Sequence, residues 1–244
     1  SSDVCSSDLS GVGVLLEIAR LLGQQQPELG VDIIFFDAED YGAPQFYNGE
    51  HKEEYWCLGT QYWARNPHVQ GYNARFGILL DMVGGKNATF YKEGYSEKYA
   101  KDVNDKVWKK ANEMGYGRFF IDKEGGPVTD DHLFINRLAG IPSIDIIPTD
   151  EGSELSGFGS FWHTVNDNMD IIDKQMKANA KDIAQLNSDL KDALVTQYAE
   201  LNGTGNNYFY VDRKQGYRLS SAILHVYDTG YIRVEAISQE VNNE

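Results

Sequence analysis

Residues 31–40 read VDIIFFDAED, and this stretch decides how the rest of the chain is interpreted. Its first seven positions are almost continuously apolar, with β-branched and aromatic side chains, which is typical of a strand buried on both faces. Strands of this kind belong to parallel sheets covered by helices. The strand leads into two adjacent carboxylates, Glu39 and Asp40. Their charges repel each other unless a cation lies between them or one carboxyl keeps a raised pKa for proton transfer.

Helices and apolar strands alternate on both sides of this stretch. The apolar periodicity predicts helices over residues 10–26, 53–64, 96–114 and 130–138, and strands over residues 31–37, 76–83, 88–92 and 141–147. This alternation predicts an α/β fold with a mostly parallel central sheet flanked by helices. Trp56 and Trp63 are expected in the core of this fold, and Cys57 between them is expected to be a buried, inert thiol.

Polar residues stand at the ends of the predicted strands. Asp81 lies near the end of the strand over residues 76–83, and Phe-Trp-His at residues 161–163 follows the strand over residues 141–147. Active sites of open α/β sheets lie beyond the carboxyl ends of the strands. A charge at a buried strand end also costs free energy unless it is paired or bound to a metal ion. The sequence therefore predicts one site that contains Glu39, Asp40, Asp81 and His163.

The composition excludes several classes of protein. Of the 244 residues, 41% are hydrophobic and 24% are charged, which is ordinary for a folded domain. The net charge of -15 argues against a nucleic acid as partner. No run approaches the roughly 20 apolar residues that a membrane helix needs. The two cysteines, Cys5 and Cys57, have no zinc-finger spacing, so a metal ion here must use carboxylates and imidazoles.

Four motifs occur in a fixed order along the chain. They are FFDAED at 35–40, LLDMVGG at 79–85, DDHLF at 130–134 followed by AGIPSID at 139–145, and FWHTVND at 161–167, after an initial SGVGVLLEIAR at 10–20. Together they resemble the M28-type zinc peptidase superfamily, which contains two-zinc aminopeptidases and single-zinc glutaminyl-peptide cyclotransferases. The Trp-His pair, the double Asp before His and the acidic, aromatic loop after Asp40 resemble the cyclotransferase branch, with Bacteroidetes members looking closest.

The resemblance implies a chemical role for each motif residue. Glu39 would carry a proton from the substrate's α-amine to the leaving amide nitrogen. Asp40 and His163 would bind one zinc ion, which would polarise the γ-carbonyl of an N-terminal glutamine. Trp162 would line the substrate pocket. The substrates implied are the N-termini of peptides or proteins.

Two other residues separate the alternative functions. In a cyclotransferase, Asp81 and Asp130 would share a proton and stabilise the transferred amide. In a two-zinc aminopeptidase, Asp81 would bind the second ion and Glu39 would deprotonate the attacking water. A binding module on the same fold is a third possibility, against which Glu39 argues, because a scaffold needs no shuttle carboxylate. We expect a monomer, from a parent protein that is secreted or periplasmic.

The two ends of the chain differ from its middle. Residues 1–9, SSDVCSSDL, resemble the conceptual translation of a sequencing adapter and are predicted to be a non-native leader. Residues 10–175 are predicted to be a partial catalytic domain that lacks its first strands. Residues 176–244 are predicted to form a helix and a β-hairpin, with strands at 217–227 and 231–237, as an extra module or as foreign sequence.

The adapter-like leader also affects the expected zinc site. In the family the first aspartate ligand lies just before the Ser-Gly of the first helix. Asp8 is one position away from that place, and its presence there is taken as accidental. The sequence as given therefore holds two of three zinc ligands, and we expect weak zinc binding and poor folding.

Overall fold

The computed structural model describes residues 6–24, 29–42, 47–153 and 156–173, together with the backbone of two tail strands. The helices are α1 (Leu9–Gln24), α2 (Leu58–Arg65), α3 (Gly94–Glu113) and α4 (Asp131–Phe134), with a 3-10 turn at Glu53–Tyr55 and a π-helical turn at Ile135–Ala139. The strands are β1 (Gly30–Phe36), β2 (Phe76–Leu80), β3 (Phe90–Lys92), β4 (Phe120–Glu124), β5 (Ser143–Ile146), β6 (Ser221–Tyr227) and β7 (Ile232–Ala236). Among the described helices, none combines the length and apolar character that crossing a membrane requires.

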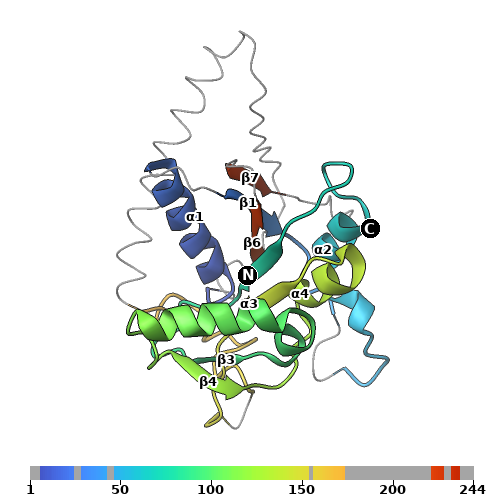
Figure 1. Cartoon of the computed structure of the whole chain (residues 1–244). Coiled ribbons are helices and arrows are strands. Elements are labelled where there is room, and N and C mark those ends of the chain that lie inside the picture. Colours follow the sequence, from blue (N-terminus) through green and yellow to red (C-terminus); the bar gives the residue numbers. More distant parts are fainter. Residues whose placement is uncertain are drawn as a thin grey trace, which may run out of the picture.

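The central sheet has five strands in the order β5-β2-β6-β1-β7 (Figure 1). β2 pairs in parallel with β5, and β1 pairs in parallel with β7. β6 runs antiparallel to both of its neighbours, β1 and β2, so those two strands point the same way. Four of the five strands therefore share one direction, and the predicted mostly parallel α/β sheet is confirmed.

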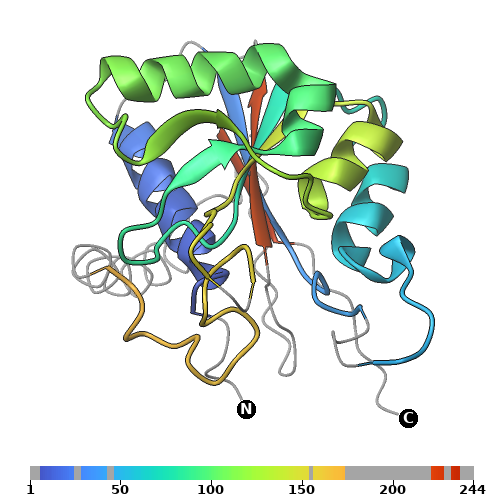
Figure 2. The ribbon, with the colours of Figure 1, turned by 90° about the horizontal axis from the view of Figure 1, so that it is seen from below.

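The side chains of β1 alternate between two apolar layers, one on each face of the sheet. Ile33 and Phe35 pack in the layer that also contains Leu15 of α1 and Trp108 of α3. Ile34 and Phe36 pack in the other layer, with Trp63 of α2 and Ile135 after α4. Figure 2 shows the sheet edge-on between α1 and the α2–α4 pair, with α3 lying across it. Because both faces are covered, β1 is buried along its whole length, as its sequence predicts.

One described strand has no counterpart among the elements predicted from the sequence. β4 pairs only with β3, in a separate two-stranded sheet, and its side chains are half-buried or exposed. Its sequence, FIDKE, contains no apolar run long enough to indicate a buried strand. A surface strand of this kind depends on its partner strand and is not indicated by its own pattern.

The tail contributes two strands to the central sheet. Strands were predicted at residues 217–227 and 231–237, and β6 and β7 lie within these ranges. They do not pair with each other as the strands of a hairpin would, because β1 lies between them. The predicted helix over residues 176–201 lies outside the described residues.

Gly11 permits the close approach of α1 to the end of β2. A Cβ atom at this position would overlap the carbonyl oxygen of Leu80. We expect Gly11→Ala to lower the free energy of unfolding by about 1–3 kcal/mol, the usual effect of overpacking. The matched control is Gly13→Ala in the same helix, where no atom lies within 4 Å of the added Cβ. The control should stabilise the protein by up to about 1 kcal/mol, because alanine is the better helix former. Denaturant unfolding measures both, and equal effects of the two variants would contradict the close contact.

Candidate active site

The structure brings together three carboxylates from separate segments of the chain. Glu39 follows β1, Asp81 directly follows β2, and Asp130 immediately precedes α4. One oxygen from each of these residues lies within 4.8 Å of the others. Asp81 and Asp130 are buried, and Glu39 is half-buried. The strand-end position of Glu39 and Asp81 explains their meeting, because β1 and β2 point the same way.

The backbone around Glu39 is fixed by the start of α2. The amide N–H groups of Cys57, Leu58 and Gly59 donate hydrogen bonds to the carbonyl oxygens of residues 39, 38 and 37, at 2.8, 3.0 and 3.2 Å. Ala38 and Cys57 both adopt a left-handed conformation, with φ of 53° and 54°. Non-glycine residues rarely adopt this conformation unless the surrounding structure imposes it. The amide groups at the N-terminus of α2, which have no partner within the helix, thus fix the backbone of Glu39 after the end of β1.

Asp40 and His163 lie side by side next to these carboxylates. The Asp40 Oδ1 and His163 Nε2 atoms are 3.4 Å apart. Two ligand atoms bound at about 2.1 Å to one tetrahedral ion lie about 3.4 Å apart, so this pair fits a zinc ion. Asp81 Oδ1 is buried and has no hydrogen-bond partner among the described residues, which a nearby cation or a shared proton would satisfy.

A third ligand for this pair is less well defined. In the described part of the chain, the sets of three potential ligands within 4.8 Å are Glu39–Asp81–Asp130 and Cys57–Asp130–Asp131. Neither set contains Asp40 or His163. The Asp40–His163 pair therefore fits two of the coordination positions of a zinc ion.

Aromatic rings enclose the His163 imidazole. Trp162 stacks on it with ring centroids 3.9 Å apart, and Phe158 packs on Trp162 at 5.1 Å. Trp56 lies parallel to His163 at 6.5 Å. The expectation that Trp56 belongs to the core is therefore wrong, since it is half-buried beside the site, whereas Trp63 is in the core. The periodicity places Trp56 inside the predicted helix over residues 53–64, whereas in the structure Trp56 lies between a 3-10 turn and α2.

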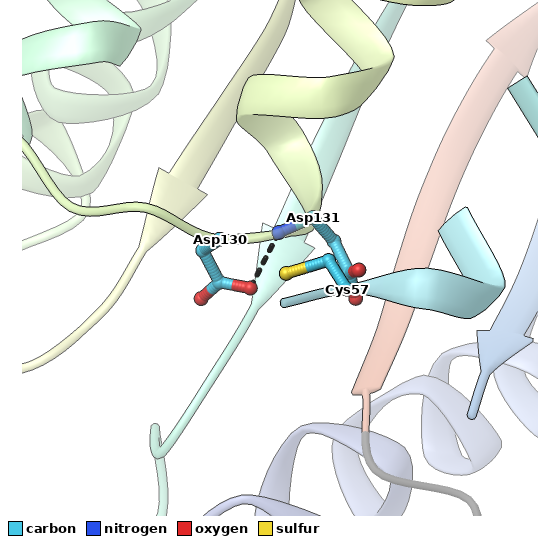
Figure 3. A group of neighbouring side chains, drawn as sticks. All are labelled: Cys57, Asp130 and Asp131. Atoms are coloured by element: carbon cyan, nitrogen blue, oxygen red, sulfur yellow. Dashed lines mark hydrogen bonds between the residues drawn. The ribbon is translucent and has the colours of Figure 1, made fainter. Parts of the chain in front are cut away.

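Cys57 and Asp131 extend the acidic cluster on its buried side (Figure 3). Asp130 Oδ1 accepts a hydrogen bond from the amide of Asp131 at 2.5 Å, and Asp131 Oδ1 accepts one from the Thr60 hydroxyl at 2.5 Å. Burial, followed by the charges of Asp131, Asp130 and Glu39, raises the pKa of the Cys57 thiol well above its ordinary value. Cys57 is therefore a buried, protonated thiol, as expected, but it lies next to the site.

Burial and mutual repulsion raise the pKa values of the carboxyls in this cluster. Burial, and then the charges of Asp130 and Asp81, raise the pKa of Glu39 well above its ordinary value. Burial and neighbouring carboxylates likewise raise the pKa values of Asp81 and Asp130. The hydrogen bond with Asp40 raises the pKa of His163. A cluster with this excess of negative charge favours a bound cation, and a carboxyl with a raised pKa is suited to proton transfer.

Asp8, whose position was taken as accidental, lies close to this cluster. It is only 8% exposed, and its charge contributes to the raised pKa values of Asp81, Asp130 and His163. The preceding residue, Ser7, holds this segment in place. Its amide and its hydroxyl both donate hydrogen bonds to the carboxylate of Asp167, in the loop that carries His163. Asp8 is therefore a candidate third ligand beside Asp40 and His163.

The raised pKa values predict how stability depends on pH in the metal-free protein. Carboxyls whose pKa is higher in the folded chain than the ordinary 3.8 or 4.5 keep their protons where the unfolded chain has lost them. Stability should therefore rise as the pH falls from neutrality toward these values. Below about pH 4.5 the trend should reverse, because the folded-state pKa of Glu93 is lowered to about 2.

Denaturant unfolding in the presence of a chelator, at about pH 5 and about pH 8, measures this dependence. The expected result is the larger free energy of unfolding at the lower pH. A larger free energy of unfolding at the higher pH would show that the carboxylates of the cluster do not repel one another in the folded chain. Saturating zinc should reduce the difference, because a cation offsets the repulsion.

The chain is similar in sequence to known proteins of the superfamily that its motifs resemble. The profile of peptidase family M28 matches residues 8–187. A glutaminyl-peptide cyclotransferase from Bos taurus is 28% identical over 213 residues, which cover 71% of this chain and 52% of that protein. The chain spans about half the length of the curated relatives it matches.

Two solved structures are more similar in sequence. Bacteroides thetaiotaomicron glutaminyl cyclase bound to N-acetylhistamine is 62% identical with a TM-score of 0.63, over 71% of this chain and 58% of that one. A Zn-dependent exopeptidase from Parabacteroides distasonis is 49% identical with a TM-score of 0.62, over 71% of this chain and 59% of that one.

Proposed function

The chain belongs to peptidase family M28, and from this premise we propose that its site converts the N-terminal glutamine of peptides to pyroglutamate with release of ammonia. The observation that carries the proposal is a half-buried carboxyl with a raised pKa, Glu39, beside a pair of side chains that fits a zinc ion, Asp40 and His163. Similarity to the glutaminyl cyclases supports it, and so does the occurrence of a Zn-dependent exopeptidase among the relatives, which favours zinc as the metal.

The residues of the chain would divide the chemistry as follows. A zinc ion held by Asp40, His163 and, as the candidate third ligand, Asp8 would supply Lewis-acid polarisation of the substrate's γ-carbonyl. Glu39 accepts a proton from the α-amine nitrogen as that nitrogen forms a bond to the carbonyl carbon of the side-chain amide. It then gives the proton to the amide nitrogen as the carbon–nitrogen bond breaks, so that ammonia leaves.

Three further residues would assist the same reaction. Asp81 and Asp130 would share a proton, because two buried carboxyls with oxygens within 4.8 Å of each other do not readily both ionise, and the protonated member would donate a hydrogen bond to the transferred amide. The Trp162 ring, stacked on His163, would line the substrate pocket. An aromatic wall there would exclude water, which would otherwise compete with the internal amine for the carbonyl.

The second candidate is a two-zinc aminopeptidase, which the similarity to an exopeptidase favours. In that reaction Asp81 would hold the second ion and Glu39 would deprotonate the attacking water. Incubation of the zinc-supplemented chain with a Gln-initiated dipeptide separates the two candidates. Ammonia release without free glutamine supports the cyclase, and free amino acid without ammonia refutes it. A Leu-initiated dipeptide is the matched control, since only a peptidase can consume it.

For the parent protein, a monomeric state and a secreted or periplasmic location stay predictions. Gel filtration of the chain and fractionation of cells that express the full gene would measure them.

A further inference from the structure

A second buried ionic group lies behind the acidic site. It consists of Glu93, His132 and Asp145, whose side chains are 2%, 0% and 0% exposed. The Glu93 Oε2 and His132 Nε2 atoms are 2.9 Å apart, and His132 Nδ1 lies 3.7 Å from Asp145 Oδ2. Buried charges are retained only where partners compensate them, so this group requires an explanation.

Glu93 joins separate segments of the chain through one carboxylate. It caps α3 by accepting hydrogen bonds from the amides of Tyr95 and Ser96, at 2.8 and 2.6 Å. It also accepts hydrogen bonds from the Ser96 hydroxyl and from the Val128 amide. Burial alone would raise the pKa of Glu93, but the hydrogen bond and charge of His132, together with these donors, lower it to about 2. Glu93 is therefore a charged anchor at neutral pH.

The contacts of Glu93 bracket Asp130 on both sides. The Val128 amide, two residues before Asp130, binds Glu93 Oε1, and the His132 side chain, two residues after it, contacts Glu93 Oε2. The preceding loop is also held to α3, because the Gly94 amide donates to the Gly126 carbonyl at 3.1 Å. α4 has only four residues, so it has little rigidity of its own. The place of Asp130 thus depends on the carboxylate of Glu93.

Asp145 is the third member of this buried ionic group. It lies on β5, opposite Leu79 of β2, and its amide donates to the Ser96 hydroxyl at 2.9 Å. Its charge contributes to the raised pKa of Asp81, and the charge of Asp130 contributes to its own raised pKa. Asp145 therefore lies beside the His132 imidazole, and its charge and that of Asp130 repel each other.

We propose that Glu93 and His132 are positioning residues that hold Asp130 in its reactive place. This inference rests on the proposed function, because it assigns Asp130 a part in that reaction. Neither Glu93 nor His132 touches the substrate. Their effect is on the rate of the chemical step, since misplacement of a reacting group by about 1 Å can slow a reaction about 10²-fold.

The test compares Glu93→Gln, His132→Leu and His132→Gln in the full, zinc-supplemented chain. The first two variants should lower kcat for ammonia release about 10-fold to 10²-fold, with KM and zinc affinity within about threefold of the parent. His132→Gln should recover part of the rate, because its amide can still donate toward Glu93. The effects of Glu93→Gln and His132→Leu should not add in the double variant, since both break one contact.

The matched control is Tyr72→Phe, which removes a partly buried hydrogen bond from the Tyr72 hydroxyl to Asp32. Both residues are distant in sequence from α4. It should lower stability without changing kcat. If Glu93→Gln and His132→Leu leave kcat unchanged, or if kcat falls only in step with zinc affinity, the positioning role is wrong. The absence of any rescue by His132→Gln would also contradict it.

If the parent chain releases no ammonia at saturating zinc, the proposed function is refuted. Amide hydrogen exchange then tests separately whether Glu93 and His132 hold Asp130 in place. In that case His132→Leu should accelerate hydrogen exchange over residues 128–134 far more than in the rest of the chain. Exchange that increases uniformly, as in Tyr72→Phe, would overturn the inference. The two failures are therefore distinguishable.

Discussion

Glu39→Gln will reduce the rate of ammonia release about 10²-fold to 10⁴-fold, the range lost when a general acid–base group is removed. The glutamine side chain has nearly the same shape, so the strand end and the contacts of α2 with residues 37–39 should persist. It cannot accept the proton from the substrate amine, and the raised pKa that suits Glu39 to this transfer is lost. Steady-state kinetics with a Gln-initiated dipeptide measures the effect.

Measurement of zinc binding distinguishes the loss of a proton-transfer group in Glu39→Gln from a disturbance of the site's structure. The variant should bind zinc at least as tightly as the parent chain, because Asp40 and His163 are unchanged. Glu54→Gln is the matched control, since Glu54 is an exposed carboxylate on the neighbouring 3-10 turn and should leave the rate unaltered. A Glu39→Gln protein with an undiminished rate would remove Glu39 from the mechanism on either functional hypothesis.

The second large effect is expected at the imidazole beside Asp40. His163→Ala should weaken zinc binding by more than about 100-fold, because even the loss of a group that only orients a ligand weakens binding about 10–100-fold. Ammonia release should fall with it, as the γ-carbonyl is no longer polarised. Competition with a chelating dye measures the affinity. His51→Ala is the control, since His51 is exposed and contacts the carbonyl and the ring of Tyr47, away from Asp40 and His163 in the chain.

The same titration addresses the third ligand. The sequence predicts a site short of one ligand and therefore weak zinc binding, whereas the structure places buried Asp8 beside the cluster. One tight site in the parent chain would show that the prediction of weak binding is wrong. Asp8→Asn should then weaken zinc about as much as His163→Ala. Unchanged affinity in Asp8→Asn would exclude Asp8 as a ligand.

Much of the described fold was predictable because its signals are local. The nearly continuous apolar run over residues 31–37 predicts a strand buried on both faces, and β1 is buried along its whole length in the structure. The long amphipathic pattern before Met114 likewise predicts α3. Strand β4 could not be predicted, since it lacks an apolar run and depends on pairing with β3.

The candidate site was predictable only in part, for a related reason. Glu39 and Asp81 stand at the ends of apolar strands, so the parallel-sheet rule alone brings them together. Trp56, Cys57 and Asp8 carry no such signal. They reach the site through a loop, a left-handed turn before α2 and the segment ahead of α1.

By itself the sequence determined the α/β class, the order of its elements and the carboxylates at the strand ends, because hydrophobic periodicity and residue type act over a few neighbouring positions. Only the tertiary structure decided that tail strand β6 lies between β1 and β2, and that Glu93 reaches across 39 positions to hold His132 and so to position Asp130. Such contacts form between segments distant in the chain, where burial selects partners that no local pattern specifies.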